Sequence, residues 1–322
     1  MIQSAGGVGR NIADALGRLG TAPLLISALG ADHHGNYILN TALRHVDTRG
    51  VVSLSGERTA CYTAILDRRG ECHYGVGDMD IHGCISPRLV ERLSSEVRNS
   101  RLVVMDGNIP EETVKFVLQL CKDAGVPVWF EPTDIRKASK PFHSDLWRSL
   151  HFISPNFNEL RVMAKAAGFY VNASLSVEKN EGDQILEEAS KLAVSLVKHI
   201  QVSIVTLGKL GVMVVRRGLA DEPLLSSTTQ MKSETAIYAR VYSVPHLHSV
   251  VSVSGAGDCL AAGIMAAMLS GMCEADCVSI GVAAARVSLQ SSAAVPAQLF
   301  PICQLKQHSV EIQYSTLITV PN

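Results

Sequence analysis

Apolar residues recur along this chain with two different periods. Short apolar-rich runs, such as RLVVMD at 101–106 and VPVWFE at 126–131, are typical of buried strands. Between them lie longer segments in which apolar residues recur every three to four positions, as in helices that bury one face. Strands that alternate with helices predict a mostly parallel sheet covered on both faces. We therefore expect an α/β fold with three layers.

The predicted elements extend from the start of the chain to about residue 290. A first helix follows a glycine loop and ends at Gly20. The predicted strands cover residues 22–30, 101–106, 126–131, 151–156, 202–208 and 211–217. The later predicted helices cover residues 86–97, 110–125, 158–168, 183–200, 258–271 and 274–290. Residues 218–240 are polar, which predicts a loop or an irregular hairpin.

Residues 51–77 depart from this alternation. The runs VVSLSG, TACYTAILD and ECHYGVG are rich in strand-forming residues, and Arg68-Arg69-Gly70 fits a turn between two of them. They predict a small antiparallel sheet inserted into one large domain that covers residues 1–295. No element is predicted for the tail at 296–322, which shows no clear periodicity.

Composition excludes several classes of protein. Of the 322 residues, 47% are hydrophobic and 18% are charged, which is typical of a globular domain. The net charge of −1 gives no electrostatic basis for binding nucleic acid or an anionic membrane. The first residues, MIQSAGGVGRN, do not resemble a signal peptide, and no run of about 18 apolar residues occurs. The eight cysteines include no CxxC pair, so we expect reduced thiols in a cytoplasmic protein.

The turn Ser254-Gly255-Ala256-Gly257-Asp258 carries the strongest chemical signal. Small residues let a backbone approach a phosphate closely, and the helix that follows presents unpaired N–H groups to an anion. An acid at this point would repel bound phosphate unless it has a task, such as general base for an attacking hydroxyl. The alternative interpretation is an Asp that only stabilises the start of the helix.

A second glycine loop, Gly6-Gly7-Val8-Gly9, precedes Arg10 and Asn11 and leads into the first helix. It is not the dinucleotide fingerprint, because the GxGxxG spacing fails and no strand precedes it. Backbone N–H groups and the Asn11 amide could bind sugar hydroxyls. A simple turn is the alternative.

Two further segments follow apolar strands. Asn156-Phe157-Asn158-Glu159 offers amides and an acid that suit a hydrated Mg²⁺, although plain helix capping explains it equally well. Thr206-Leu207-Gly208-Lys209 fits a place beside a nucleotide or, alternatively, a hairpin turn. Glu131 ends a buried strand and is a candidate for lining the cleft, whereas His33, His34 and His45 fit surface positions.

Taken together, these motifs resemble those of the ribokinase-like, or pfkB, carbohydrate kinases. The GG-x-x-x-N signature matches Gly6, Gly7 and Asn11, and the GAGD signature matches residues 255–258. The N-x-x-E element matches Asn156 and Glu159, and the T-x-G element matches Thr206 and Gly208. Within the family, the stretches QSAGGVGRNIADALGRLG, GVGDMDIH, MDGNIP and WFEPTD are most similar to the pseudouridine kinases.

The resemblance implies an ATP-dependent kinase that phosphorylates the 5′-hydroxyl of pseudouridine. It implies Asp258 as the base, an anion hole formed by Gly255, Ala256 and Gly257, and ATP beside Thr206 and Gly208. Asn108, with the Gly6-Gly7 loop and Asn11, would contact the substrate, and Asn156 and Glu159 would hold Mg²⁺ through water. The sheet at 51–77 would be the lid, and a homodimer through the lid is a further expectation.

Two departures from the family pattern qualify these expectations. The family usually has one or two strands before the GG loop, with an Asp that holds sugar hydroxyls, whereas here only a few residues precede Gly6. The central sheet is therefore expected to lack a strand, and the chain to be less stable and weakly active or inactive. Ser252-Val253-Ser254 also replaces the usual D-T-[TV], which argues against a monovalent-cation site.

Two alternative functions follow. The first is a kinase of the same family for ribose, adenosine or a ketohexose, because the glycine motifs are shared. The second is a binding protein without catalytic activity.

Overall fold

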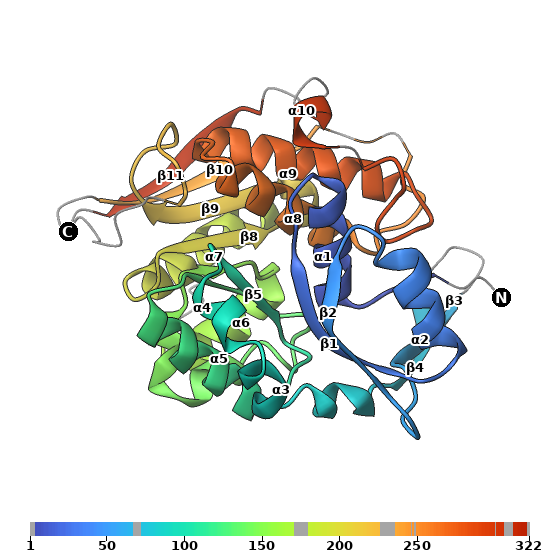
Figure 1. The fold of residues 1–322 in the computed structure, drawn as a ribbon. Coiled ribbons are helices and arrows are strands. Elements are labelled where there is room, and N and C mark those ends of the chain that lie inside the picture. The colour runs from blue at the N-terminus through green and yellow to red at the C-terminus, as the bar shows by residue number, and fades with distance from the viewer. Residues whose placement is uncertain are drawn as a thin grey trace.

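The structure is a computed structural model that describes residues 4–66, 72–170, 180–225, 236–299 without 246 and 248, 301–305 and 312–320. The strands of its central sheet are β5 (Val103–Asp106), β6 (Val128–Glu131), β7 (Phe152–Ile153), β8 (Val202–Thr206), β9 (Val212–Arg217), β10 (Ile237–Tyr242) and β11 (Tyr314–Val320). They lie in the order β11-β10-β9-β8-β7-β6-β5 (Figure 1). Pairs from β5 to β8 are parallel, and pairs from β8 to β11 are antiparallel.

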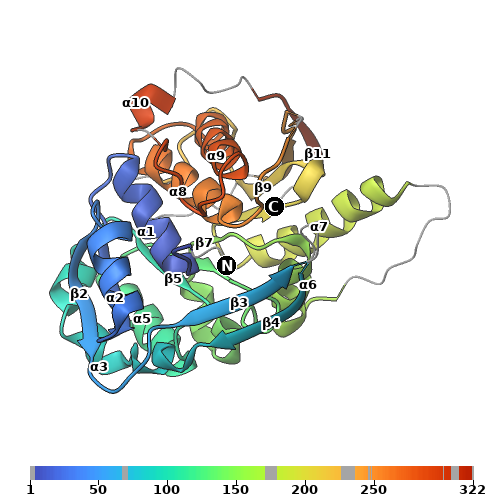
Figure 2. The ribbon, with the colours of Figure 1, turned by 90° about the vertical axis from the view of Figure 1, so that its right-hand side faces the viewer.

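Helices cover both faces of this sheet, as Figures 1 and 2 show. The helices on one face are α1 (Val8–Arg18), α8 (Ala256–Leu269) and α9 (Glu274–Leu289). The helices on the other face are α5 (Glu111–Ala124), α6 (Phe157–Ala166) and α7 (Glu181–Val197). Strand residues alternate between the two: Trp129 and Phe152 pack toward α8, and Phe130 and Ile153 pack toward α5. The three-layer α/β fold predicted from the sequence is confirmed.

The remaining helices are short. They are α2 (His33–Tyr37), α3 (Pro87–Glu91), α4 (Ser94–Arg98) and α10 (Ile302–Leu305). The single helix predicted from residue 86 is divided into α3 and α4. Among the described helices, none is both long and apolar enough to cross a bilayer.

Two smaller sheets lie apart from the central one. In the first, β1 (Leu24–Gly30) pairs in parallel with β2 (Asp47–Leu54). In the second, β3 (Cys61–Leu66) pairs antiparallel with β4 (Cys72–Asp78), side by side in Figure 2. The insertion predicted at 51–77 therefore begins too early, because residues 51–54 belong to β2. A run of strand-forming residues indicates a strand but not its partner.

A cavity of about 2330 Å³ lies between β1 and β5. Residues 24–29 and 103–106 both line it. Within the described part of the chain, no strand pairs with the outer edge of β5, and β1 pairs with β2 alone. In the described residues, the strands β1 and β2 therefore form a sheet separate from the one that ends at β5.

The segment after residue 295 contributes to the central sheet. β11 pairs antiparallel with β10, from Ile237 opposite Val320 to Tyr242 opposite Tyr314. The sequence analysis predicts no element here, although YSTLITV is rich in β-branched residues. β10 likewise starts inside the polar region 218–240 and forms a hairpin with β9.

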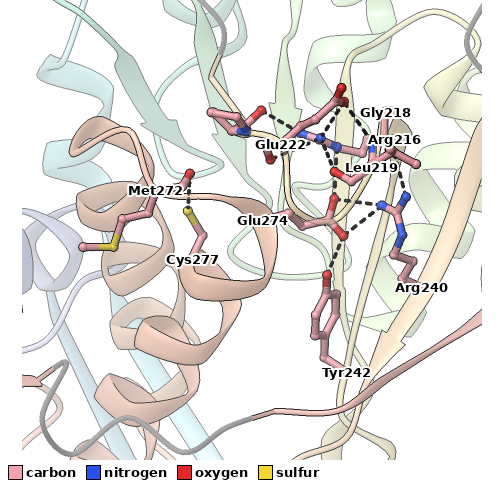
Figure 3. Close-up of polar contacts among 10 residues, drawn as sticks. Arg216, Gly218, Leu219, Glu222, Arg240, Tyr242, Met272, Glu274 and Cys277 are labelled. Carbon is pink, nitrogen blue, oxygen red and sulfur yellow. Dashed lines mark hydrogen bonds and ion pairs between the residues drawn. The ribbon is translucent and has the colours of Figure 1, made fainter.

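A buried ionic cluster joins this hairpin to the start of α9 (Figure 3). Glu274 is fully buried, and Arg216 and Arg240 are 4% and 2% exposed. Both Glu274 carboxylate oxygens accept hydrogen bonds from Arg240 Nη1, at 3.1 and 3.0 Å, and Arg216 Nε lies 3.0 Å from Oε2. The Tyr242 hydroxyl donates to Oε1 at 2.7 Å, and Arg240 Nη2 donates to the Gly218 carbonyl at 2.6 Å. Glu274 is therefore the shared counter-ion of two buried cations from adjacent strands, and Glu222, 3.7 Å from Arg216, supplies a second negative charge.

Replacement of Glu274 by Ala should destabilise the fold strongly, because Arg240 would stay buried without its counter-ion and Arg216 would keep only the more distant Glu222. Breaking a buried pair from one side typically costs about 3–5 kcal/mol. Urea unfolding of Glu274→Ala should show a loss of this size. Glu188→Ala is the matched control, because Glu188 pairs with the half-exposed Arg161 at the surface, where a pair contributes up to about 1 kcal/mol. Equal losses in the two variants would contradict the assignment.

Candidate active site

The start of α8 has the geometry of an anion-binding turn. Gly255 precedes the helix with φ of 80°, a left-handed conformation that favours glycine. A Cβ on Gly255 would lie 2.3 Å from the Ala294 carbonyl oxygen, so a side chain is excluded by space as well. Within the described structure, the backbone N–H groups of Gly255, Gly257 and Asp258 donate no hydrogen bond. These donors, at the positive end of a helix, are available to a phosphate.

Asp258 lies in the first turn of α8 and contacts Asn11, which follows the Gly6–Gly9 loop. The Asn11 amide donates from Nδ2 to Asp258 Oδ2 at 2.6 Å, across 247 residues of sequence. Burial raises the pKa of Asp258 to about 6, and the nearby carboxylate of Asp106 adds to the rise, while Asn11 and Arg10 act in the opposite direction. The favourable helix N-terminus expected from the sequence is therefore outweighed by desolvation. A carboxyl group with this pKa is suited to accept a proton near neutral pH.

The glycine loop ahead of α1 is held by Arg10, a residue to which the sequence analysis assigns no role. Its guanidinium donates to the Gly6 carbonyl at 3.2 Å and to the Ala5 carbonyl at 2.7 Å. The same group forms an ion pair with the buried Asp14 at 3.2 Å and donates to the Asn11 side-chain oxygen. Arg10 thus fixes both the loop backbone and the Asn11 amide, whose nitrogen is left to face Asp258. The basic residue directly before Asn11 is the sequence feature that could have indicated this role.

Asp106 connects the end of β5 to this loop. Its carboxylate accepts the Gly9 N–H at 2.9 Å and the Asn108 N–H at 2.9 Å. It also accepts the Asn108 amide Nδ2 at 2.8 Å, while Lys137 donates to Asn108 Oδ1 at 2.8 Å. In Asn108, the side-chain oxygen and one N–H of the side-chain amide are thus hydrogen-bonded, and the second amide N–H remains available. Asp106 and Lys137 were not identified from the sequence, although an acid that ends an apolar strand is a usable signal.

The residues of the N-x-x-E and T-x-G elements lie at the ends of adjacent strands. Asn156 pairs with Thr206 as an isolated bridge, and Gly208 follows with φ of 58°. Asn156 Oδ1 accepts the N–H groups of Asn158 and Glu159, each at 3.0 Å, and Glu159 Oε2 accepts the Asn156 N–H at 2.8 Å. This reciprocal capping box is the alternative considered from the sequence, and it occupies one oxygen of each side chain.

One cavity gathers some of the predicted residues and leaves others outside its lining. The predicted residues that line it are Gly6, Gly7, Asn11, Asn108, Gly255 and Asp258. Those that do not are Ala256, Gly257, Asn156, Glu159, Thr206 and Gly208. The lining residues come from the glycine loop at 6–9, the start of α1, the segment after β5 and the α8 turn, so the two glycine motifs line one cavity.

Several carboxyl groups gather around this region. Burial raises the pKa of Glu131 well above its ordinary value, and the neighbouring Asp258, Glu159 and Asp106 raise it further. Ser154 donates a short hydrogen bond to Glu131, and its oxygen accepts the Trp129 indole N–H at 2.6 Å. A bound cation would relieve the electrostatic repulsion among these carboxylates.

A hydrated divalent cation fits this arrangement better than a directly ligated one. No group of three His, Cys, Asp or Glu side chains in the described residues is placed to hold a metal ion directly. Mg²⁺ usually keeps several waters and needs only one or two carboxylates. Glu159 has one carboxylate oxygen beyond its capping bond, so it can meet a metal-bound water.

Comparison with known proteins bears on the geometry described above. A family model described as pfkB family carbohydrate kinase matches residues 1–299. The chain belongs to this family. It is 27% identical over 319 residues to a pseudouridine kinase of Arabidopsis thaliana, covering 90% of this chain and 83% of that protein. It is 28% identical over 277 residues to a pseudouridine kinase of Escherichia coli, covering 85% and 76%.

A solved pfkB-like structure agrees with the fold. The Arabidopsis thaliana ribokinase complexed with ribose and ATP superposes with a TM-score of 0.69 at 22% identity, covering 94% of this chain and 87% of that one. As a pfkB family member, the chain is a phosphotransferase with an alcohol group as acceptor. The acceptor hydroxyl must lose its proton in the course of an in-line attack, and accepting that proton is the task considered for Asp258.

If Asp258 is the base of this pfkB kinase, its ionised form is the active one. Because its pKa is about 6 in the free protein, kcat/KM should fall about tenfold per pH unit below that value and level off above it. The Asn11 hydrogen bond lowers the pKa, so Asn11→Ala should move the midpoint of this limb to higher pH. A pH profile of kcat/KM for both proteins measures the effect. An unmoved midpoint would mean that another group controls the limb.

Proposed function

We propose that this chain transfers the γ-phosphoryl group of ATP to the 5′-hydroxyl of pseudouridine. The observation that carries the proposal is the hydrogen bond from Asn11 Nδ2 to Asp258 Oδ2. This hydrogen bond connects the segment expected to hold the nucleoside with the turn expected to hold the phosphates. Both predicted sites therefore meet at the Asp258 carboxylate. Similarity to the two pseudouridine kinases above supports the choice of acceptor, and the motifs at 6–11 and 255–258 support the reaction.

The proposed chemistry is an in-line displacement. The 5′-oxygen attacks the γ-phosphorus as its proton passes to Asp258, and the bond from the γ-phosphorus to the β,γ-bridging oxygen breaks to release ADP. The N–H groups of Gly255 and Gly257 would stabilise charge on the transferred group, and that of Ala256 would join them although it also lies 3.4 Å from the Val253 carbonyl. Mg²⁺, when bound, would neutralise phosphate charge near Asn156 and Glu159. Thr206 and Gly208 would lie beside the nucleotide.

The nucleoside is proposed to lie at the end of the cavity away from the α8 turn. Gly6, Gly7 and Asn11 would meet the ribose, and Asn108 would offer its remaining amide N–H. Arg10 and Lys137 keep these groups in place through the contacts described above. Because Lys137 occupies the Asn108 oxygen, Asn108 would act on substrate as a donor, which suits an oxygen acceptor on the ligand.

The small sheet is proposed to be the lid and a dimer contact. Tyr62 and Ile65 on β3 and Tyr74 and Val76 on β4 are 57–71% exposed. Tyr62 and residues 75 and 77 also line the cavity. Tyr62, which lines the cavity, is suited to close over a ligand, and the other exposed apolar side chains of the sheet are suited to meet a second copy of the chain.

An acceptor panel tests the proposed substrate. ADP release with ATP and Mg²⁺ should be measured for pseudouridine, uridine, ribose and adenosine, with the phosphorylated product identified by mass. We expect kcat/KM for pseudouridine to exceed the others at least about tenfold, a difference of roughly 1.4 kcal/mol in transition-state binding. Ribose is the alternative acceptor, because the superposed ribokinase is a structural relative. A preference for ribose or adenosine would replace pseudouridine, and ATP binding without turnover would favour a non-catalytic role.

Asp258→Asn should lower kcat by about 10²–10⁴-fold while ATP binding changes only a few-fold, because a general base contributes to the chemical step. Asp145→Asn is the control, since Asp145 is fully exposed at the surface and forms only a local pair with Arg148. Single-turnover kinetics and calorimetric titration with ATP would separate the two effects. A variant that keeps more than about a tenth of kcat would remove Asp258 from the mechanism.

A further inference from the structure

Behind the anion-binding turn lies a buried polar contact that the mechanism above does not use. Ser288, near the end of α9, is fully buried. Its hydroxyl donates to the Ala294 carbonyl at 3.0 Å and lies 3.4 Å from the Ser254 carbonyl. One proton is thus shared between two carbonyl oxygens that belong to different segments, with the shorter contact as the principal hydrogen bond.

The backbone of the turn packs directly against the Ala294 carbonyl oxygen. A Cβ at Gly255 would meet this oxygen at 2.3 Å, which shows how closely the backbone approaches it. The Cys259 thiol donates to the same oxygen at 3.4 Å from one turn further along α8. Ala294 therefore supports the turn on both sides of Asp258, and Ser288 fixes the position of its carbonyl.

The segment before the turn is anchored to the same end of α9. The Val251 N–H donates to the Leu289 carbonyl at 2.8 Å, and the Ser252 N–H approaches that oxygen at 3.4 Å. With Ser288 next to Leu289, the residues before the Ser254–Gly255 peptide are held by α9, whereas Gly255 after it lies against the Ala294 carbonyl. Val253 between them is 77% exposed, and the contacts of this stretch are local: the Ser254 N–H donates to Ser252 Oγ at 3.1 Å, and the Ala256 N–H lies 3.4 Å from the Val253 carbonyl.

The orientation of the Ser254–Gly255 peptide decides what the turn offers to an anion. In a trans peptide the C=O and the following N–H point in opposite directions. A Ser254 carbonyl directed inward to Ser288 therefore turns the Gly255 N–H away from the interior, where no described residue accepts it. Without the Ser288 proton, no described residue would donate to the Ser254 carbonyl, and the Ala294 carbonyl would keep only the weak Cys259 thiol donor. The peptide would then lose the hydrogen bond that fixes its orientation.

We propose that Ser288 is a positioning residue for phosphoryl transfer, which holds the Ser254–Gly255 peptide so that its N–H faces the transferred phosphate. It touches no substrate and acts through the backbone of the turn. This inference rests on the proposed function, since it assigns the anion to the α8 turn.

The matched control for Ser288 is Ser190. Ser190 is also fully buried in a helix, and its hydroxyl also donates to a carbonyl, Glu187 O at 2.9 Å, but it lies on α7, which packs on the opposite face of the sheet. Ser288→Ala and Ser190→Ala each remove one buried hydroxyl. Both should lower Tm by a similar few degrees, so a difference in catalysis between them isolates the effect on the turn.

We expect Ser288→Ala to lower kcat about tenfold and to raise the Kd for ATP a few-fold, with the nucleoside KM within about twofold of the parent, because only the phosphate end loses its support. Ser190→Ala should keep both kcat and Kd. Ser288→Cys, which keeps the side-chain volume and a weak donor, should fall between the two and serves if the Ala variant does not fold.

Titration with ATP alone, without any acceptor, separates this inference from the proposed function. A parent protein that binds ATP but phosphorylates another acceptor overturns the pseudouridine assignment and leaves the Ser288 test intact. A parent protein that does not bind ATP removes both. Equal kcat and equal ATP affinity in the parent and in folded Ser288→Ala, or an equal loss in Ser190→Ala, would overturn the positioning role.

Discussion

The contact between Asn11 and Asp258 depends on two helices meeting with their N-termini at one point. α1 and α8 lie on the same face of the sheet and pack through small side chains, so that their first turns come within hydrogen-bond distance. On its other side α8 approaches α9 closely, because a Cβ on Gly263 would lie 2.7 Å from the Gly281 Cα on α9. The position of Asp258 therefore depends on the packing of α8 against α1 and α9 as well as on its own hydrogen bond to Asn11.

That packing also explains the electrostatics of the region. Helices that pack closely exclude water from their shared end, and the loss of hydration is the largest influence on the pKa of Asp258. Glu131 and Glu159, behind it, experience the same effect, as burial raises the pKa of both. Desolvation and charge crowding thus favour a proton or a cation at several neighbouring positions, which is the condition that a phosphate-handling site must meet.

Local patterns in the sequence were sufficient to predict the layers and the turns. The α5 helix ends at Gly125 in a left-handed conformation, as its glycine predicts, and the GAGD turn precedes a helix as its small residues predict. What local patterns could not provide was pairing over long separations. Asp106 meets Gly9 across 97 residues, and no composition or period marks an acid as the partner of a distant loop.

The same limit accounts for the errors in the sheets. β2 was assigned to the small antiparallel sheet because its residues favour strands, but the choice between β1 and β3 as a partner is made by tertiary packing. The capping box at Asn156 shows the reverse case, since its geometry is local and was one of two interpretations available from the residues alone.

The pairing of β10 with β11 has a consequence for folding. Tyr242 pairs with Tyr314 and Ile237 with Val320, so the last strand of the sheet closes a long loop of chain before its ladder can form. Contacts between residues so far apart form slowly, because the entropy of loop closure must be overcome first. Until β11 docks, the edge of β10 presents unpaired N–H and C=O groups to other chains. Refolding from denaturant is therefore a competition between this intramolecular closure and intermolecular strand pairing, and dilution favours the native outcome.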